Sequence, residues 1–210
     1  KKNSNGKYTY SKLIFANNYK KITVTTPPKN TELKVTATQT TSSVTLKWNK
    51  IAGATDYRIY AYRKGAWKKL TDTSSLTYTE KKLNSGSTYK YRIEPLHKFE
   101  GDIVWSTKKK EIETSTKPAT STLKVSSTAK NKAVLNWSNP AGENGFEIYY
   151  STKKDSGFKK YTTTKANVKK ATVSKLTSGK TYYFKVRSFK TTKSGKAYSA
   201  YSAVKSVKIK

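Results

Sequence analysis

The sequence predicts an all-β protein built from two tandem seven-stranded sandwiches, preceded by a short β segment. Three observations support this prediction. An eleven-residue pattern, Leu-x-Ser-Gly-x-Thr-Tyr-x-aromatic-x-aliphatic, occurs at 83–93 and again at 176–186, which indicates two copies of one domain. Short runs of alternating apolar and polar residues are separated by turn residues in both halves. The 16 Tyr, 6 Phe and 4 Trp favour strands, and no stretch has a helical pattern.

Residues 1–26 match neither copy of the repeat, and we interpret them as a β segment. It is either the tail of a preceding unit or a joining strand. One strand is predicted over 8–15, a turn at 17–18 and a second strand over 19–26. Because the chain has no Met, we expect it to be a piece of a longer protein. Two prolines at 27–28, which cannot donate to a β-ladder, mark the start of the first domain.

The first domain is predicted at 27–117 and the second at 118–210, with a linker near 116–120. In the first domain, strands are expected at 31–36, 44–48, 56–60, 67–70, 76–79, within the motif at 83–93, and at 103–114. In the second domain they are expected at 121–126, 134–137, 145–149, 158–161, 168–173, within the motif at 176–186, and at 198–209. Hairpin turns are predicted at 64–65 and 155–157.

Seven short strands, an early tryptophan and a tyrosine after the Leu-x-Ser-Gly turn are typical of an immunoglobulin-like sandwich. Within that class, residues 27–210 resemble fibronectin type III domains. The residues that carry the resemblance are Pro27 or Pro118, Trp48 or Trp137, Tyr57 or Phe146, and the repeated motif. The resemblance implies that the motif tyrosine forms a corner by bonding to backbone near the preceding leucine. It therefore assigns structural roles to Trp48, Trp137, Tyr89, Tyr182, Leu83 and Leu176.

The abundance of Lys, Ser and Thr, with the run Ser-Gly-Lys-Ala-Tyr-Ser-Ala-Tyr-Ser at 194–202, resembles tandem copies in secreted Firmicutes proteins. In those proteins such domains are usually non-catalytic spacers or adhesion modules. The resemblance implies an extracellular location, at the cell surface or in the cell wall. No apolar run approaches the ~18 residues that a membrane-spanning helix needs.

The formal charge of +32 is unevenly distributed along the chain. Residues 1–26 carry 6 basic and 0 acidic groups, 27–117 carry 18 and 9, and 118–210 carry 20 and 3. Nearly all the basic residues are lysines, which attract polyanions diffusely and lack the planar fork of arginine. We expect an anionic cell-wall polymer, a glycan or neighbouring protein domains as partners. Nucleic acid is disfavoured because the lysines do not concentrate in one groove.

The chain has few side chains that commonly serve in catalysis. It contains one His and no Cys, and the second domain has only three acidic residues. His97 is expected to be a solvated or hydrogen-bonded residue in the loop after the sixth strand. We predict that the chain is not an enzyme and has no catalytic, cofactor-binding or metal-binding residues.

A candidate ligand face follows from strand parity. If Tyr57, Ile59 and Ala61 point to the core, the alternate residues of that strand point outward, as do those of the neighbouring sixth strand. Tyrosines among cations suit sugars or phosphate-rich glycans. The predicted face contains Arg58, Tyr60, Tyr62, Lys90 and Arg92 in the first domain, and Tyr149, Tyr183, Lys185 and Arg187 in the second.

Three functions remain open from the sequence. The chain is a Lys-rich spacer or adhesion module that contacts an anionic cell wall, or a glycan-binding module that uses the candidate ligand face. Alternatively, it is a structural subunit of a surface assembly, in which residues 1–26 are donated to a neighbouring molecule's sheet.

Overall fold

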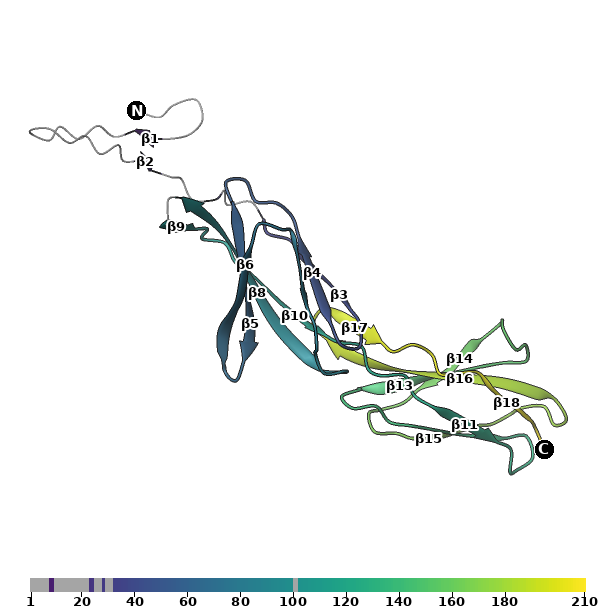
Figure 1. The fold of residues 1–210 in the computed structure, drawn as a ribbon. Coiled ribbons are helices and arrows are strands. Elements are labelled where there is room, and N and C mark those ends of the chain that lie inside the picture. Colours follow the sequence, from purple (N-terminus) through teal and green to yellow (C-terminus); the bar gives the residue numbers. More distant parts are fainter. Residues whose placement is uncertain (1–7, 10–22, 25–27, 29–31, 100–101) are drawn as a thin grey trace, which may run out of the picture. The chain divides into compact units, whose positions relative to one another are not determined.

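The computed structural model describes residues 8–9, 23–24, 28, 32–99 and 102–210, and every regular element in these ranges is a β-strand (Figure 1). The strands build two β-sandwiches of two sheets each. The predicted all-β fold of tandem sandwiches is therefore confirmed.

The N-terminal segment contributes two short strands, β1 (Tyr8–Thr9) and β2 (Thr23–Val24), which pair antiparallel with Tyr8 opposite Val24. At these positions the segment pairs within its own chain. The remainder of the predicted strands at 8–15 and 19–26 lies outside the described residues, as does most of the proposed joining strand.

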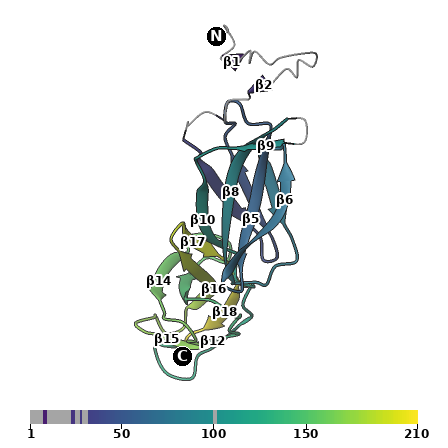
Figure 2. The ribbon, with the colours of Figure 1, turned by 90° about the vertical axis from the view of Figure 1, so that its left-hand side faces the viewer.

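The first sandwich consists of a three-stranded and a five-stranded sheet. The smaller sheet contains, in spatial order, β3 (Val35–Gln39), β4 (Val44–Trp48) and β7 (Thr77–Glu80). The larger sheet contains, in spatial order, β10 (Lys110–Ser115), β8 (Thr88–Phe99), β5 (Asp56–Arg63) and β6 (Ala66–Thr73), and β9 (Asp102–Trp105) pairs with the end of β8 (Figure 2).

Alternation along the strands creates the core of the first sandwich. Tyr57, Ile59 and Ala61 of β5 are all buried, as the predicted parity requires. The ring of Trp48 on β4 packs against Tyr57 with centroids 5.6 Å apart, which joins the two sheets. The Tyr57 hydroxyl accepts a hydrogen bond from the amide of Ile51 at 2.8 Å, so its polar end is satisfied inside the core.

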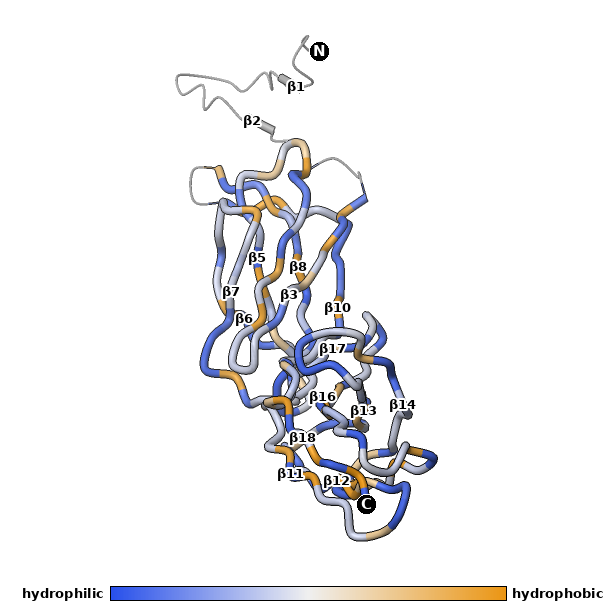
Figure 3. The backbone as a smooth tube through the Cα atoms, turned by 90° about the vertical axis from the view of Figure 1, so that its right-hand side faces the viewer, coloured by the Kyte–Doolittle hydropathy of each residue, from blue (hydrophilic) through white to orange (hydrophobic). Residues whose placement is uncertain are grey.

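The second sandwich repeats this architecture. Its smaller sheet contains β11 (Leu123–Ser126), β12 (Ala133–Trp137) and β15 (Lys170–Val173). Its larger sheet contains β14 (Lys159–Thr163), β13 (Gly145–Ser151), β16 (Thr181–Thr192) and β17 (Gly195–Tyr198), and β18 (Lys205–Lys208) also pairs with β16. Trp137 packs against Phe146 at 5.4 Å, as Trp48 does against Tyr57. Apolar and polar residues alternate along the strands (Figure 3).

The last predicted strand of each domain is interrupted. The strand predicted at 103–114 is split into β9 and β10, because the Ser106 hydroxyl accepts a hydrogen bond from the amide of Lys108 at 3.1 Å and forms a local turn. The strand predicted at 198–209 is replaced by the end of β17 and by β18. His97 lies within β8 and not in a loop, because β8 continues to pair with β9 and places His97 opposite Val104.

Two serines bridge the gap between β17 and β18. The hydroxyl of Ser199 accepts a hydrogen bond from the amide of Ser188 at 3.0 Å, and that of Ser202 accepts one from the amide of Val186 at 3.1 Å. The amides of the same two serines donate back to the carbonyls of Ser188 and Val186. Side-chain hydroxyls thus replace carbonyl acceptors and hold the Tyr-Ser-Ala-Tyr-Ser run against β16.

The repeated motif places its tyrosines next to their own turns. The hydroxyl of Tyr89 accepts a hydrogen bond from the amide of Asn84 at 2.9 Å, and that of Tyr182 accepts one from the amide of Thr177 at 3.2 Å. In both domains the tyrosine hydroxyl is thus hydrogen-bonded to the amide of the residue that directly follows the motif leucine. Leu176 is buried and Leu83 is half-buried.

The linker predicted near 116–120 lies between the end of β10 at Ser115 and the start of β11 at Leu123. The domain boundaries themselves stay predictions.

Candidate ligand face

The candidate ligand face of the first sandwich lies on the outward side of β5 and β8. Antiparallel pairing sets Arg58 opposite Glu94 and Tyr60 opposite Arg92. With Tyr57 on the inner side, the outward positions of β5 fall at even-numbered residues.

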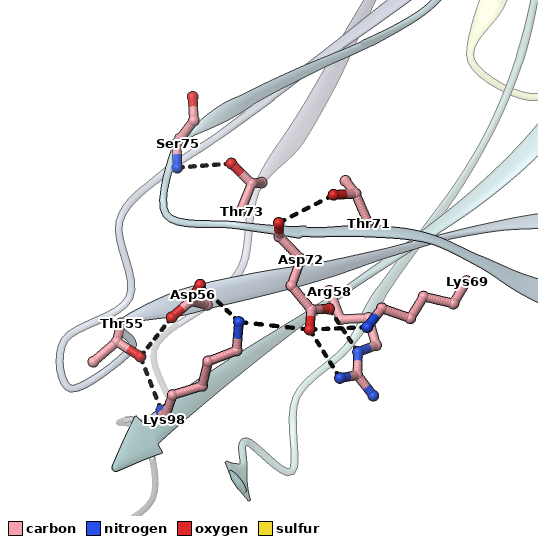
Figure 4. Close-up of polar contacts among 9 residues, drawn as sticks. All are labelled: Thr55, Asp56, Arg58, Lys69, Thr71, Asp72, Thr73, Ser75 and Lys98. Atoms are coloured by element: carbon pink, nitrogen blue, oxygen red, sulfur yellow. Dashed lines mark hydrogen bonds and ion pairs between the residues drawn. The ribbon is translucent and has the colours of Figure 1, made fainter. Parts of the chain in front are cut away.

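Arg58 is neutralised by a carboxylate that was not part of the predicted face. Its Nε and Nη2 donate to the two oxygens of Asp72 at 2.7 and 2.9 Å (Figure 4). Lys69 lies 3.0 Å from Asp72, while Lys98 bonds Asp56 at 3.1 Å and lies 3.6 Å from Asp72. The hydrogen bond from Arg58 holds the pKa of the Asp72 carboxyl well below its usual range, even though burial opposes this shift. Arg58 is therefore paired with a carboxylate of its own sandwich.

Arg92 is engaged in the same way at the centre of the sheet. It bonds Glu111 at 3.0 Å and Glu94 at 3.3 Å, and its guanidinium lies 4.2 Å from the ring centroid of Trp67. Trp67 in turn meets Tyr62 edge to face at 5.2 Å. Tyr62 remains 40% exposed, so the free part of this cluster is aromatic and not cationic.

The other predicted members differ in exposure. Tyr60 is half-buried, with the Arg92 guanidinium 5.8 Å from its ring. Lys90 is exposed near the start of β8. Trp105 on β9, which the parity argument missed, is 39% exposed and covers Arg58 at 4.6 Å.

In the second sandwich, Glu147 is the centre of the corresponding face. Its side chain is buried and accepts hydrogen bonds from Arg187 at 2.7 and 2.9 Å, from the Tyr149 hydroxyl at 2.8 Å and from Lys160 at 3.2 Å. Burial alone would raise the pKa of Glu147, but these hydrogen bonds outweigh it and the pKa lies below its ordinary value. Burial, with hydrogen bonds to Tyr201 and Glu147, raises the pKa of Tyr149.

Aromatic rings from the Tyr-Ser-Ala-Tyr-Ser run cover the remaining cations. The Arg187 guanidinium lies 3.8 Å from the ring centroid of Tyr198 and 4.9 Å from that of Tyr201. The Lys185 ammonium lies 4.2 Å from both Phe158 and Tyr201. Tyr183 is half-buried, opposite Ser151 on β13. The structure thus brings the predicted residues of each domain onto one face, but carboxylates and aromatic rings of the same sandwich occupy the arginines and Lys185.

Most of the positive charge of the second sandwich is carried by exposed lysines. Of the 20 basic residues in 118–210, 17 are exposed lysines. Of the three acidic residues, Glu143 and Glu147 are 7% and 3% exposed, which leaves Asp155 as the exposed carboxylate of this range. The exposed charged side chains of 118–210 are therefore almost all cationic.

Among the described residues, no group of three His, Cys, Asp or Glu side chains lies close enough to hold a metal ion. The described part of the chain contains no helix that is long and apolar enough to cross a bilayer.

Comparison with known proteins identifies the class of fold. The two-domain fibronectin type III segment from chicken tenascin superposes with a TM-score of 0.50 at 19% identity, over 87% of this chain and 99% of that one. The FN1–FN3 domains of chicken CNTN1 give a TM-score of 0.46 at 15% identity, over 90% and 71%. The tenascin likeness shows that the chain has a tandem fibronectin type III fold.

The sequence comparison is more specific for the second half. Residues 117–205 match the model of the fibronectin type III domain family. No curated protein matches the chain. Fibronectin type III domains are generally non-enzymatic and typically serve as spacers or adhesion modules in multidomain proteins.

Proposed function

We propose that this chain is a non-catalytic extracellular module that attaches a larger surface protein to an anionic polymer of the cell wall. The charge distribution of residues 118–210 supports this proposal, because this range has 17 exposed lysines and only one exposed carboxylate among its described residues. An anionic, phosphate-rich polymer matches such a surface without requiring a shaped pocket.

The ion pairs of the arginines indicate which side chains would bind the polymer. Arg58, Arg92 and Arg187 each bond a carboxylate of their own sandwich, so bidentate recognition of a ligand by these groups is disfavoured. The lysines carry the attraction instead, as hydrated point charges. Such attraction is screened within about 10 Å at 0.1 M salt, so it should be strongly salt-dependent.

A pull-down on purified Gram-positive cell walls tests this function. We expect the full chain to be retained on walls that carry teichoic acid, and retention to fall at least about tenfold between 50 and 200 mM salt. Walls stripped of teichoic acid should retain little protein. Equal retention on both preparations, or retention that salt does not change, would contradict the proposal. Equal affinity for duplex DNA at the same salt concentration would reject preference for the wall.

Glycan binding is a second candidate, and the exposed ring of Tyr62, which meets the half-buried Trp67 edge to face, favours it. Sugar rings stack on such exposed aromatic surfaces. Replacement of Tyr60 and Tyr62 together by Ala should abolish the retention on walls that persists at high salt. Tyr161→Ala is the matched control, because Tyr161 is 39% exposed on the other sandwich. Unchanged retention of the double variant would exclude this candidate.

A further inference from the structure

A groove on the second sandwich is not explained by the proposed attachment. It has a volume of about 730 Å³ and is lined by residues 120–125 on one side and by Ala203 and Lys205 on the other. β11 is the edge strand of its sheet, and β18 is bonded to β16. The two edges meet at one end, where the amide of Lys210 donates to the Ser127 hydroxyl at 3.0 Å. The groove is lined by residues of both segments.

The hydrogen-bond phase of β11 determines which peptide groups face this groove. The amide of Ser138 donates to the carbonyl of Thr122, and Lys124 stands opposite Asn136 on β12. In an antiparallel ladder such bonds fall on alternate residues, so those of β11 fall on even-numbered positions. The N–H and C=O groups of Leu123 and Val125 therefore point away from β12, toward the free edge. This edge can accept one more strand.

A buried hydroxyl at the same place lacks a partner. Ser121 is 3% exposed and lines the groove, and its Oγ has no hydrogen-bond partner among the described residues. A buried polar atom without a partner is costly, and an incoming peptide group would satisfy it. Leu123, Val125 and Ala203 give the groove an apolar floor for alternate side chains of an added strand.

The positive charge around the groove favours an acidic ligand. Lys124 and Lys205 are exposed on its two sides, and neither is paired with a carboxylate in the described part of the chain. The chain's own segment 1–26 carries 6 basic and 0 acidic residues, and a second copy carries a formal charge of +32, so both are repelled. We propose that the free edge of β11 binds an extended acidic segment of a partner protein, which joins the sheet as an additional strand.

Fluorescence anisotropy with the full chain tests the charge requirement. The probe is a labelled eight-residue peptide of alternating Val and Glu, and the comparison peptide alternates Val and Lys. The Val-Glu peptide should bind and the Val-Lys peptide should not. The double variant K124E/K205E should weaken binding about tenfold, as expected for the loss of two charge contacts. The control K165E/K193E has the same net charge but changes exposed lysines outside the groove.

Peptide N-methylation separates strand addition from simple charge attraction, and it leaves the protein unaltered. Methylation at every second residue blocks one hydrogen-bonding edge of the peptide. One of the two methylation phases should abolish binding and the other should preserve it. On binding of the unmodified peptide, the amides of Leu123 and Val125 should become protected from hydrogen exchange. Equal binding of both methylated peptides, or no added protection of these amides, would overturn the proposal.

The two double variants also separate peptide binding from attachment to the cell wall. K124E/K205E and K165E/K193E should lose wall retention equally, because diffuse attachment depends on total charge. Only the first variant should lose the peptide.

Discussion

Trp48 and Trp137 are buried at equivalent positions, and in each the indole Nε1 has no hydrogen-bond partner among the described residues. Their contribution to stability is therefore expected to come from packing against Tyr57 and Phe146. Trp137→Ala should reduce the free energy of unfolding by about 3–5 kcal/mol, and Trp137→Phe by roughly 1–2 kcal/mol. Denaturant unfolding of the two variants measures this difference. A near-neutral Ala variant would exclude a core role, and the same pair of substitutions applies to Trp48.

Glu147 illustrates a buried charge that depends on its partners. Glu147→Gln leaves Arg187 and Lys160 without their carboxylate, so we expect a loss of roughly 2–4 kcal/mol in the free energy of unfolding at pH 7. Asp155→Asn is the control, and because Asp155 is exposed, that substitution should change stability by less than about 0.5 kcal/mol. Equal stability of the two variants would show that the buried network contributes no net stability.

At the scale of elements, a β-bulge decides which residues meet. The turn at Lys64-Gly65, with φ values of 49° and 82°, sets Tyr62 opposite Trp67 and Tyr60 opposite Lys69. A register shift between Ile59 and Tyr60 then sets Arg58 opposite Asp72. Without this shift, Arg58 would face Thr71. A corresponding shift between Ile148 and Tyr149 occurs in the second sandwich.

The Arg58–Asp72 pair predicts how the hairpin of β5 and β6 responds to acid. Because the folded-state pKa of Asp72 is lowered, its stabilising effect is fully present above the unfolded-state pKa of about 3.9 and is lost as the pH falls below that value. Asp72→Asn should cost about 1.5–3 kcal/mol at pH 7 and less at pH 2. Thermal melts of both proteins between pH 2 and pH 7 measure the difference. A constant difference across this range would contradict the assignment of the pair.

At the scale of the whole molecule, the predicted domain boundary gives a direct test. If the second domain is 118–210, that fragment alone should unfold in one cooperative transition, because a complete hydrophobic cluster lies within it. Circular dichroism during a urea titration measures the transition. A fragment without cooperative unfolding would show that the boundary is wrong or that the domain needs its neighbour.

Much of the architecture followed from the sequence. The period-two alternation around Tyr57 and Ile59 and the repeated motif identified the strands and their inward faces. The parity argument also brought Arg58, Tyr60 and Arg92 to one face. It missed Asp72 and Trp105, which reach that face from other strands.

The sequence by itself determined the tandem β fold and the large excess of lysine, because alternation and composition are local properties of the chain. Only the tertiary structure decided which cations are available to a partner. Pairing across strands depends on register, and the register of β5 with β6 and of β13 with β14 shifts by one residue. The shift between β5 and β6 sets Asp72 opposite Arg58, and the register of β13 with β16 sets Glu147 opposite Arg187. The exposed lysines remain as the charge that a partner meets.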